Sequence, residues 1–173
     1  SSDGTAIVSI LAGKATDITA NPNLASNIYT LTIDSTAPTV SITSSTASSG
    51  SATSSTTLSY TATFSESVTG FNATDITVTG TANGTNPKVS SFAGSGTTYT
   101  FNVLKGSSDG TAIVSILAGK ATDLAANPNT ASNTYTLTID TISLTVAISS
   151  STASSNAATN STTLNYTAIF SKP

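Results

Sequence analysis

The chain repeats itself at a fixed distance of 106 residues. Residues 1–17 recur unchanged as 107–123, and about 50 of the 67 positions in 1–67 are identical in 107–173. Solenoid coils and propeller blades repeat every ~20–50 residues, so this period is too long for them. It suits one β-sandwich of about 100 residues per repeat. The repeat therefore predicts an array of small domains.

The boundaries of the repeat follow from a linker-like stretch, Asp34–Pro38, between two strand-like segments; Asp140 occupies the place of Asp34 one period later. One complete repeat then covers about 36–141. Residues 1–35 correspond to the last third of a preceding repeat, and residues 142–173 to the first third of a following one. We expect the chain to be a window on a longer array.

Hydrophobic residues alternate with Thr and Ser along the complete repeat. In the clearest segment Leu58, Tyr60, Ala62 and Phe64 share one face. Period-two alternation with β-branched outward residues indicates half-buried antiparallel strands. We predict seven strands in an all-β, two-sheet Greek-key sandwich, although a barrel with the same strands fits the alternation equally well. The predicted strands are Thr39–Thr43, Thr57–Phe64, Asp75–Thr79, Lys88–Phe92, Thr98–Leu104, Thr111–Leu117 and Asn133–Ile139.

The aromatic residues lie mostly at inward positions of these strands and are predicted to form the core. Phe71 is expected to plug one end of the sandwich, and Phe92 has no clear assignment. The inward aromatic residues are Tyr60, Phe64, Tyr99, Phe101 and Tyr135. A surface platform for stacking sugar rings is therefore not expected from them.

Ser and Thr make up about two-fifths of the chain. One interpretation is a disordered, O-glycosylated stalk. The other is a folded β-protein whose outward positions carry hydroxyl groups. Apolar residues reach 37% and are regularly spaced, which favours the folded form. Cys is absent, so neither disulfides nor thiolate metal sites can contribute.

The charges exclude several classes of function. Charged residues make up 8%, the net charge is −3 and no Arg occurs, which excludes electrostatic binding of nucleic acid or of a membrane surface. No apolar run is long enough to insert in a membrane. His and Cys are absent, so nucleophile pairs with either are impossible. Six of the eight acidic residues are copies of one another, which favours structural roles, and we expect no enzyme.

Several motifs together resemble bacterial immunoglobulin-like tandem repeats of large cell-surface adhesins. They are Asp-x-x-Ala-Pro at the junction, Phe-Ser-Glu-Ser-Val-Thr-Gly-Phe at 64–71, Gly-Ser-Gly-Thr-Thr-Tyr-Thr-Phe at 94–101, and Asp-Gly-Thr-Ala followed by Ala-Thr-Asp-x-Ala-Ala-Asn. The resemblance covers the whole chain. It implies an extracellular or cell-surface protein whose modules extend and space, while binding often lies in a terminal domain.

The resemblance also implies calcium at the junctions, because related repeats use acids at these places. The candidate ligands are Asp17, Asp34, Asp123 and Asp140. Calcium takes six to eight oxygen ligands, which loop carbonyls and two or three carboxylates can supply. The alternative is that Asp123 begins an Asx-turn and Asp140 merely ends a strand. Glu66 is replaced by Lys172 in the next copy, which would remove a ligand if Glu66 were one.

Glycans are the other predicted decoration. Asn-x-Ser/Thr sequons begin at Asn72, Asn83, Asn160 and Asn165. Asn72 and Asn83 are expected in loops, and Asn165 on the outward face of its strand. Sugars would solubilise a fibre with so few charges. The alternative is that the hydroxyl-rich strands are bare.

The expected role is mechanical. The modules would act as spacers of an extracellular stalk or fibril, with neighbouring repeats or identical chains as partners; the alternative is an adhesin-type module that binds glycan or another cell. Pro38 stiffens the first linker. The second linker lacks it, and Ile142 and Leu144 are expected to pack against a module end. The two terminal segments together lack the strands equivalent to 75–104, so they cannot complete one sandwich, but their strand edges could pair with a neighbouring chain.

Overall fold

The computed structural model describes residues 3–83 and 88–173, except for the side chain of Asn83. Residues 1–140 form one compact unit and residues 141–173 a second. Two antiparallel hairpins lie outside the central sandwich in sequence. They are β1 (Gly4–Val8) with β2 (Tyr29–Ile33), and β10 (Val146–Ser150) with β11 (Tyr166–Phe170).

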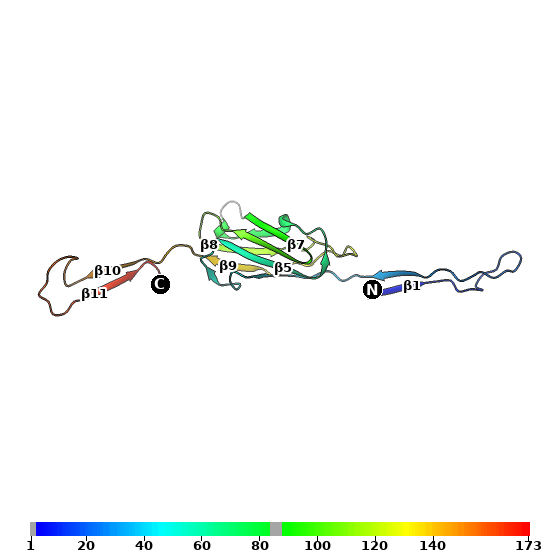
Figure 1. Cartoon of the computed structure of the whole chain (residues 1–173), viewed down its shortest axis with the longest axis horizontal. Helices are drawn as coiled ribbons and strands as arrows, with labels where there is room; N and C mark the ends of the chain where they lie inside the picture. The colour runs from blue at the N-terminus through cyan, green and yellow to red at the C-terminus, as the bar shows by residue number, and fades with distance from the viewer. Residues whose placement is uncertain (1–2, 84–87) are drawn as a thin grey trace. The chain divides into compact units, whose positions relative to one another are not determined.

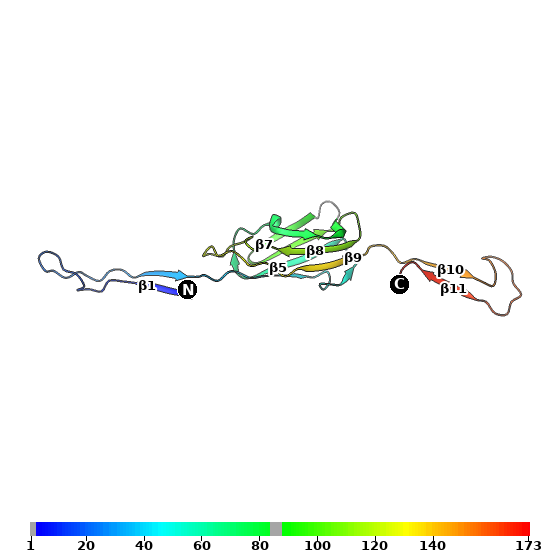
Figure 2. The same ribbon diagram turned by 180° about the vertical axis from the view of Figure 1, so that it is seen from behind.

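The central module consists of two separate sheets (Figures 1 and 2). The three-stranded sheet has the order β3 (Val40–Ser44), β5 (Thr57–Val68), β7 (Lys88–Leu104). The four-stranded sheet has the order β4 (Ala52–Thr53), β9 (Tyr135–Ile139), β8 (Gly110–Ile116), β6 (Ile76–Thr79). Two 3₁₀ turns, η1 (Ala73–Asp75) and η2 (Thr81–Asn83), precede β6 and β7. The two sheets settle the choice between sandwich and barrel in favour of the sandwich.

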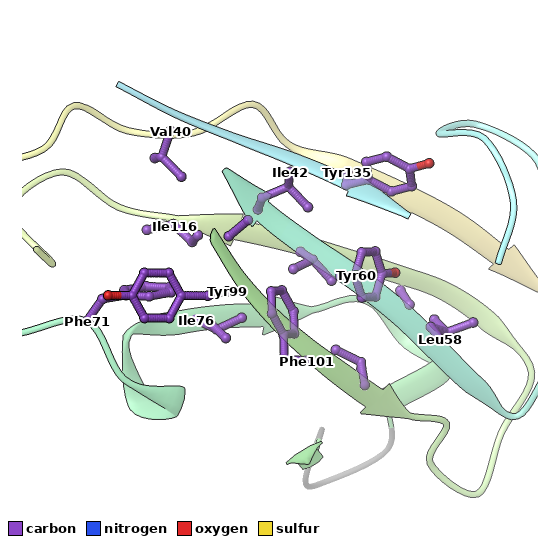
Figure 3. Close-up of a cluster of buried hydrophobic side chains, with 14 of the residues drawn as sticks. Val40, Ile42, Leu58, Tyr60, Phe71, Ile76, Tyr99, Phe101, Ile116 and Tyr135 are labelled. Carbon is purple, nitrogen blue, oxygen red and sulfur yellow. The ribbon is translucent and has the colours of Figure 1, made fainter. Parts of the chain in front are cut away.

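The core lies between the sheets, as the alternation of β5 predicts. Leu58, Tyr60, Ala62 and Phe64 are buried, and the residues between them face outward. Figure 3 shows Tyr60 and Phe101 side by side from adjacent strands and Tyr135 facing them from the other sheet. Tyr60 stacks on Phe101 at a centroid distance of 5.5 Å and meets Tyr135 edge-on at 5.6 Å. All five aromatic residues predicted to be inward are buried.

Phe71 closes one end of this core, as expected from the sequence. It is buried and makes edge-on contacts with Phe64, Tyr99 and Phe92 at 5.1–5.6 Å. Phe92 is half-buried and stacks on Tyr99 at 5.7 Å. The aromatic residues of this end thus form one continuous cluster.

The ends of most strands shift by one or two residues and β5 extends to Val68, but two differences from the prediction go further. The predicted strands Lys88–Phe92 and Thr98–Leu104 belong to one element, β7, whose backbone has positive φ at Ser91, Gly94 and Gly96. At Gly94 an added Cβ would lie 2.2 Å from the Thr98 carbonyl oxygen, so only glycine fits where the chain approaches itself this closely. The short strand β4 was not predicted, and its pairing with β9 is parallel. Two residues are too few to show an alternation.

Ile142 and Leu144 belong to the second unit, where both side chains are more than half exposed, and their packing against a module end stays a prediction. Pro38 occupies the place equivalent to Leu144 and is fully buried, and its carbonyl accepts a hydrogen bond from Thr130 N. Within the described residues, no helix is long and apolar enough to cross a membrane.

Candidate functional site

Three carboxylates meet where the first linker enters the central module. One oxygen from each of Asp34, Glu66 and Asp123 lies within 4.8 Å of the others. Asp34 follows β2 directly, Glu66 lies near the end of β5, and Asp123 lies in the loop between β8 and β9. We call these three residues the junction cluster. It is the densest group of potential metal ligands among residues 3–83 and 88–173.

The loop that carries Asp123 is shaped by its own polar side chains. The Asp123 carboxylate accepts hydrogen bonds from the backbone and side-chain nitrogens of Asn127, both at 2.9 Å. Ala126 takes a positive φ of 69°, and its N–H donates to the Asp123 carbonyl. The side chain of Asn129 accepts from Lys120 N and Ala121 N at 2.7 Å each. The backbone of Ala125, two residues on, also donates to the Asp123 carboxylate, which makes the Asx-turn given above as the alternative role of Asp123.

The same loop is tied to the linker and to β5. Asn127 donates its side-chain N–H to the Asp34 carbonyl at 3.1 Å. Thr69 and Thr122 exchange two backbone hydrogen bonds, 2.7 and 3.1 Å long, in an isolated bridge. The loop between β8 and β9 thus contacts both the residue that follows β5 and the linker at the start of the module. Asn127 was missed by the sequence reasoning; its repetition as Asn21 in the motif Asp-x-x-x-Asn was the available signal.

The linker is also held from the side of the first hairpin. The carboxylate of Asp3 accepts hydrogen bonds from the backbone N–H and the hydroxyl of Ser35, both at 2.7 Å, and from the Thr36 hydroxyl. These bonds, that of Thr36 first, lower the pKa of Asp3. The Asp34 carboxylate accepts from Thr36 N at 3.0 Å. The residues before Pro38 are therefore fixed by several side chains.

The negative charges of the junction cluster favour the binding of a cation among its three carboxylates. Burial raises the pKa of Glu66, and the neighbouring carboxylates of Asp34, Asp123 and Asp3 raise it further. Asp123 is only 4% exposed. Its burial opposes ionisation, but the hydrogen bonds from Asn127 and from the loop backbone outweigh that effect and lower its pKa. A cation would relieve the repulsion that these charges exert on Glu66.

Of the four predicted calcium ligands, the structure brings together Asp34 and Asp123. Asp17 and Asp140 lie elsewhere. Asp17 binds the backbone and side chains of Thr19 and Asn21, so it repeats the Asx-turn of Asp123, and these bonds lower its pKa, that of the Asn21 side chain most. Asp140 follows β9, whose length separates it from the Asp123 loop that precedes this strand. Its backbone N–H donates to the Thr53 carbonyl.

The predicted glycosylation sites have different surroundings. Asn72 is the exposed N-cap of η1, and it forms a capping box with Asp75 and accepts from Thr74 N at 2.9 Å. This capping role by itself accounts for Asn at that position. Asn160 and Asn165 are exposed in the last segment. The sequon of Asn83 continues into residues 84–87, outside the described residues.

Comparison with known proteins gives one match. The profile of a family described as bacterial Ig-like domain matches residues 34–139, well over half of the chain. The matched range begins at the first linker and ends at the last residue of β9. Neither the curated proteins nor the solved structures contain a significant match.

Proposed function

The chain belongs to the bacterial Ig-like domain family, and from that premise we propose that its module is a spacer in an extracellular stalk or fibril. Domains of this family often occur in surface and extracellular proteins and are generally not enzymes. The internal repeat supports the proposal, because a spacer gains length simply by adding copies. The role is mechanical: each module adds a fixed length, and short linkers limit bending.

The observation that carries this proposal is the fixed linker. Asp3 binds it through Ser35 and Thr36, while Asn127 binds the carbonyl of Asp34. Pro38 follows with a restricted φ and a fully buried ring. A linker held in this way transmits orientation from one module to the next, which a stalk requires and a freely tethered binding domain does not.

The surface of the central module gives less support to the adhesin alternative. Its aromatic side chains lie in the core, apart from the half-buried Phe92. A shallow depression of about 370 Å³ beside β6 is lined by small apolar and Thr side chains and one Lys. Binding of sugars usually depends on exposed aromatic faces and several convergent polar groups, and this depression offers neither.

Immunogold labelling of thin sections of bacterial cells with an antibody to the central module tests the spacer role. We expect gold particles outside the envelope, displaced from the cell surface along filaments. A glycan array probed with the 173-residue chain tests the alternative. Label confined to the cytoplasm would contradict the proposal, and saturable binding to a defined glycan would favour the adhesin.

We further propose that the junction cluster binds calcium and stiffens the linker. The three carboxylates fit a hard divalent cation, since they supply charged oxygens at one point. When bound, the ion would offset the mutual repulsion of Glu66, Asp34 and Asp123. In the next copy Lys172 replaces Glu66, so the acidic triplet is not repeated there.

Calorimetric melting of the full chain with calcium and with chelator tests this site. A ligand at about 100 times its Kd adds about 2.7 kcal/mol to the stability of the state that binds it. The melting temperature should rise with calcium, and Glu66→Gln should abolish most of the rise. Asp17→Asn is the matched control and should keep it. An identical calcium response in wild type and Glu66→Gln would exclude the site.

We also propose that the array is glycosylated at its exposed sequons. Asn160 and Asn165 are the better acceptors, because both are exposed and neither caps a turn as Asn72 does. Intact-mass spectrometry of the protein purified from its native source should show heterogeneous added mass, which peptide mapping should assign to these sites or to nearby hydroxyl groups. A native mass equal to that of the bare polypeptide would contradict this proposal.

A further inference from the structure

The first and the last segments of the central module run side by side in the same direction. The entry segment, residues 38–53, contains β3 and β4, and the exit segment, residues 129–140, contains β9. The pairing of β4 with β9 is parallel. Every other strand pair in the part of the chain that the structure describes is antiparallel. The chain thus brings together, in one direction, the two segments through which it enters and leaves the module.

Hydrogen bonds join these two segments from the entry of the module onward. Thr130 N donates to the carbonyl of Pro38 at 2.8 Å, where the chain enters. The side chain of Asn133 then accepts from Ile42 N at 2.7 Å and donates to the Ile42 carbonyl at 3.1 Å. One side chain therefore connects β3 to the exit segment in both senses.

The series continues to the exit of the module. The Tyr135 hydroxyl donates to the Ala47 carbonyl at 2.6 Å, and Thr136 N donates to the Ser49 hydroxyl oxygen at 3.1 Å. Backbone bonds of 2.7–3.0 Å follow from Gly50 N to the Thr136 carbonyl, from Thr138 N to the Ser51 carbonyl, and from Asp140 N to the Thr53 carbonyl. We call the whole series of hydrogen bonds between the entry and exit segments the clamp.

The clamp joins the edges of the two sheets. β3 is an outer strand of its sheet, and β4 and β9 form one side of the other sheet. Each segment is also paired within its own sheet, β3 to β5 and β9 to β8. Both segments are anchored in the core by buried side chains, which are Pro38, Val40 and Ile42 from the entry segment and Tyr135, Leu137 and Ile139 from the exit segment.

The direction of the two segments decides how tension acts on the clamp. The chain enters at Pro38, beside Thr130, and leaves at Asp140, beside Thr53, so entry and exit lie at opposite ends of the clamp. Pulling on the array draws the two segments past each other along their axes. Because hydrogen bonds between strands run across the strands, they are then strained together. Antiparallel segments would have both pulled ends on one side, and their bonds would open one after another.

We propose that the clamp sets the force at which the module unfolds under tension. This property deepens the proposed spacer role and rests on it, since a module carries such tension when it is part of a stalk. The entry and exit segments are attached to opposite ends of the load, so they have to separate before the module can lengthen. The strands β5 to β8 lie between them in the sequence and take the load only after the clamp has broken.

Optical-tweezers measurements on single molecules, pulled in two directions, test the proposal. The chain has no Cys, so a pair of introduced Cys residues gives unique attachment points in the full chain. Thr39→Cys with Thr141→Cys applies force at entry and exit and shears the clamp. Ser54→Cys with Thr141→Cys applies force at one end of the clamp and peels it. The sheared module should open in one step of roughly 300 Å, since about 100 residues reach at most 3.3–3.6 Å each. The peeled module should open at a several-fold lower force.

Two substitutions weaken the clamp in the shearing direction. Asn133→Ala removes both bonds to Ile42 and should speed unfolding at constant force about ten- to a hundredfold. Ser49→Ala removes only the acceptor of Thr136 N, from an exposed side chain, so the module stays folded and its unfolding should be about two- to tenfold faster.

Each substitution has a control outside the clamp. Val103→Ala removes buried side-chain volume from β7 and should lower the melting temperature, yet it should speed unfolding under force less than Asn133→Ala does. Ser41→Ala introduces the residue that the next copy has at Ala147, and it should leave the unfolding rate unchanged.

Equal unfolding forces in the two directions would overturn the proposal. So would an effect of Val103→Ala under force as large as that of Asn133→Ala, or an effect of Ser41→Ala as large as that of Ser49→Ala. These measurements use the purified chain and are independent of where the protein occurs in the cell. Cytoplasmic label with a strong clamp would therefore refute the spacer role alone, and a weak clamp in a surface filament would refute the clamp alone.

Discussion

Asn129 and its copy Asn23 make the same side-chain hydrogen bonds, but only Asn129 is buried. Substituting each of them tests how far burial decides what these hydrogen bonds contribute to stability. The Asn129 side chain accepts from Lys120 N and Ala121 N at 2.7 Å and donates to the carbonyls of Leu117 and Thr130 at 3.2 and 2.7 Å. It is 2% exposed. Asn129→Ala would leave several of these groups without partners where water has little access.

The cost follows from the number of groups that are orphaned. Each buried backbone group without a partner costs about 1–3 kcal/mol. The bond to Ala121 is fully buried and the other three are partly buried, so we expect a loss of about 3 kcal/mol. For a domain of this size that lowers Tm by about 12–20 °C. Differential scanning calorimetry on the full chain, following the transition of the central module, measures it.

The chain contains its own control for this prediction. Asn23 makes the same four bonds, to Lys14, Ala15, Leu11 and Leu24, but in an exposed loop. Water can replace them there, so Asn23→Ala should change the stability of the central module by less than about 0.5 kcal/mol. Equal effects of the two substitutions would refute the reasoning, because burial would then not decide the cost.

Three further predictions concern the core, a turn and pH. Leu137→Ala should destabilise the module by about 2–5 kcal/mol in urea melts, whereas Leu31→Ala, its exposed copy, should not affect the module's unfolding. Gly80→Ala should cost more than about 2 kcal/mol by the same assay, because the φ of Gly80 is +108° and an added Cβ would lie 2.2 Å from the Thr111 carbonyl oxygen. The control is Gly50→Asn, which should be nearly neutral, because Asn156 stands at the equivalent position of the next copy with a positive φ. With chelator present, Tm should rise as the pH falls from 7 toward the ordinary pKa of Glu, because the folded state raises the pKa of Glu66 and protonation then favours folding. That gain should be absent from Glu66→Gln.

At lower pH the sign reverses. The folded state lowers the pKa values of Asp3 and Asp123, so the stability that these carboxylates contribute is present above the ordinary pKa of Asp and is lost as the pH falls below it. A maximum of Tm between these two ranges is therefore expected without divalent cations. A Tm that falls steadily from pH 7 downward would contradict the assignment of Glu66.

The alternation of the strands was sufficient to predict an all-β fold and its buried face, whereas the choice between sandwich and barrel needed the two separate sheets of the structure. The alternation of β5 identifies the buried face residue by residue, and the repeat shows that the domain is about 106 residues long. It could not reveal β4, which is too short for any pattern. Nor could it show that the predicted strands 88–92 and 98–104 are one element, because Gly94 and Gly96 read as a break in pairing.

Two of the three residues of the junction cluster were predicted from the sequence as ligands, but their meeting point was not. Asp34 and Asp123 were both candidates. Asp123 lies beside the linker that precedes its module because its loop lies at that end of the sandwich. That follows from the order of the strands and not from their spacing in the chain. Glu66 was considered but set aside because Lys172 replaces it, and Asn127 was missed because its contact with Asp34 spans 93 residues.

Electron microscopy of the native assembly tests the central claim most directly. β5 has 12 residues and is about 40 Å long at ~3.3 Å per residue, which sets the length of one module. If the chain is a spacer, the images should show continuous strings of modules with an axial repeat near this length. Modules that are scattered along flexible tethers, or that cluster into globular particles without an axial repeat, would contradict it.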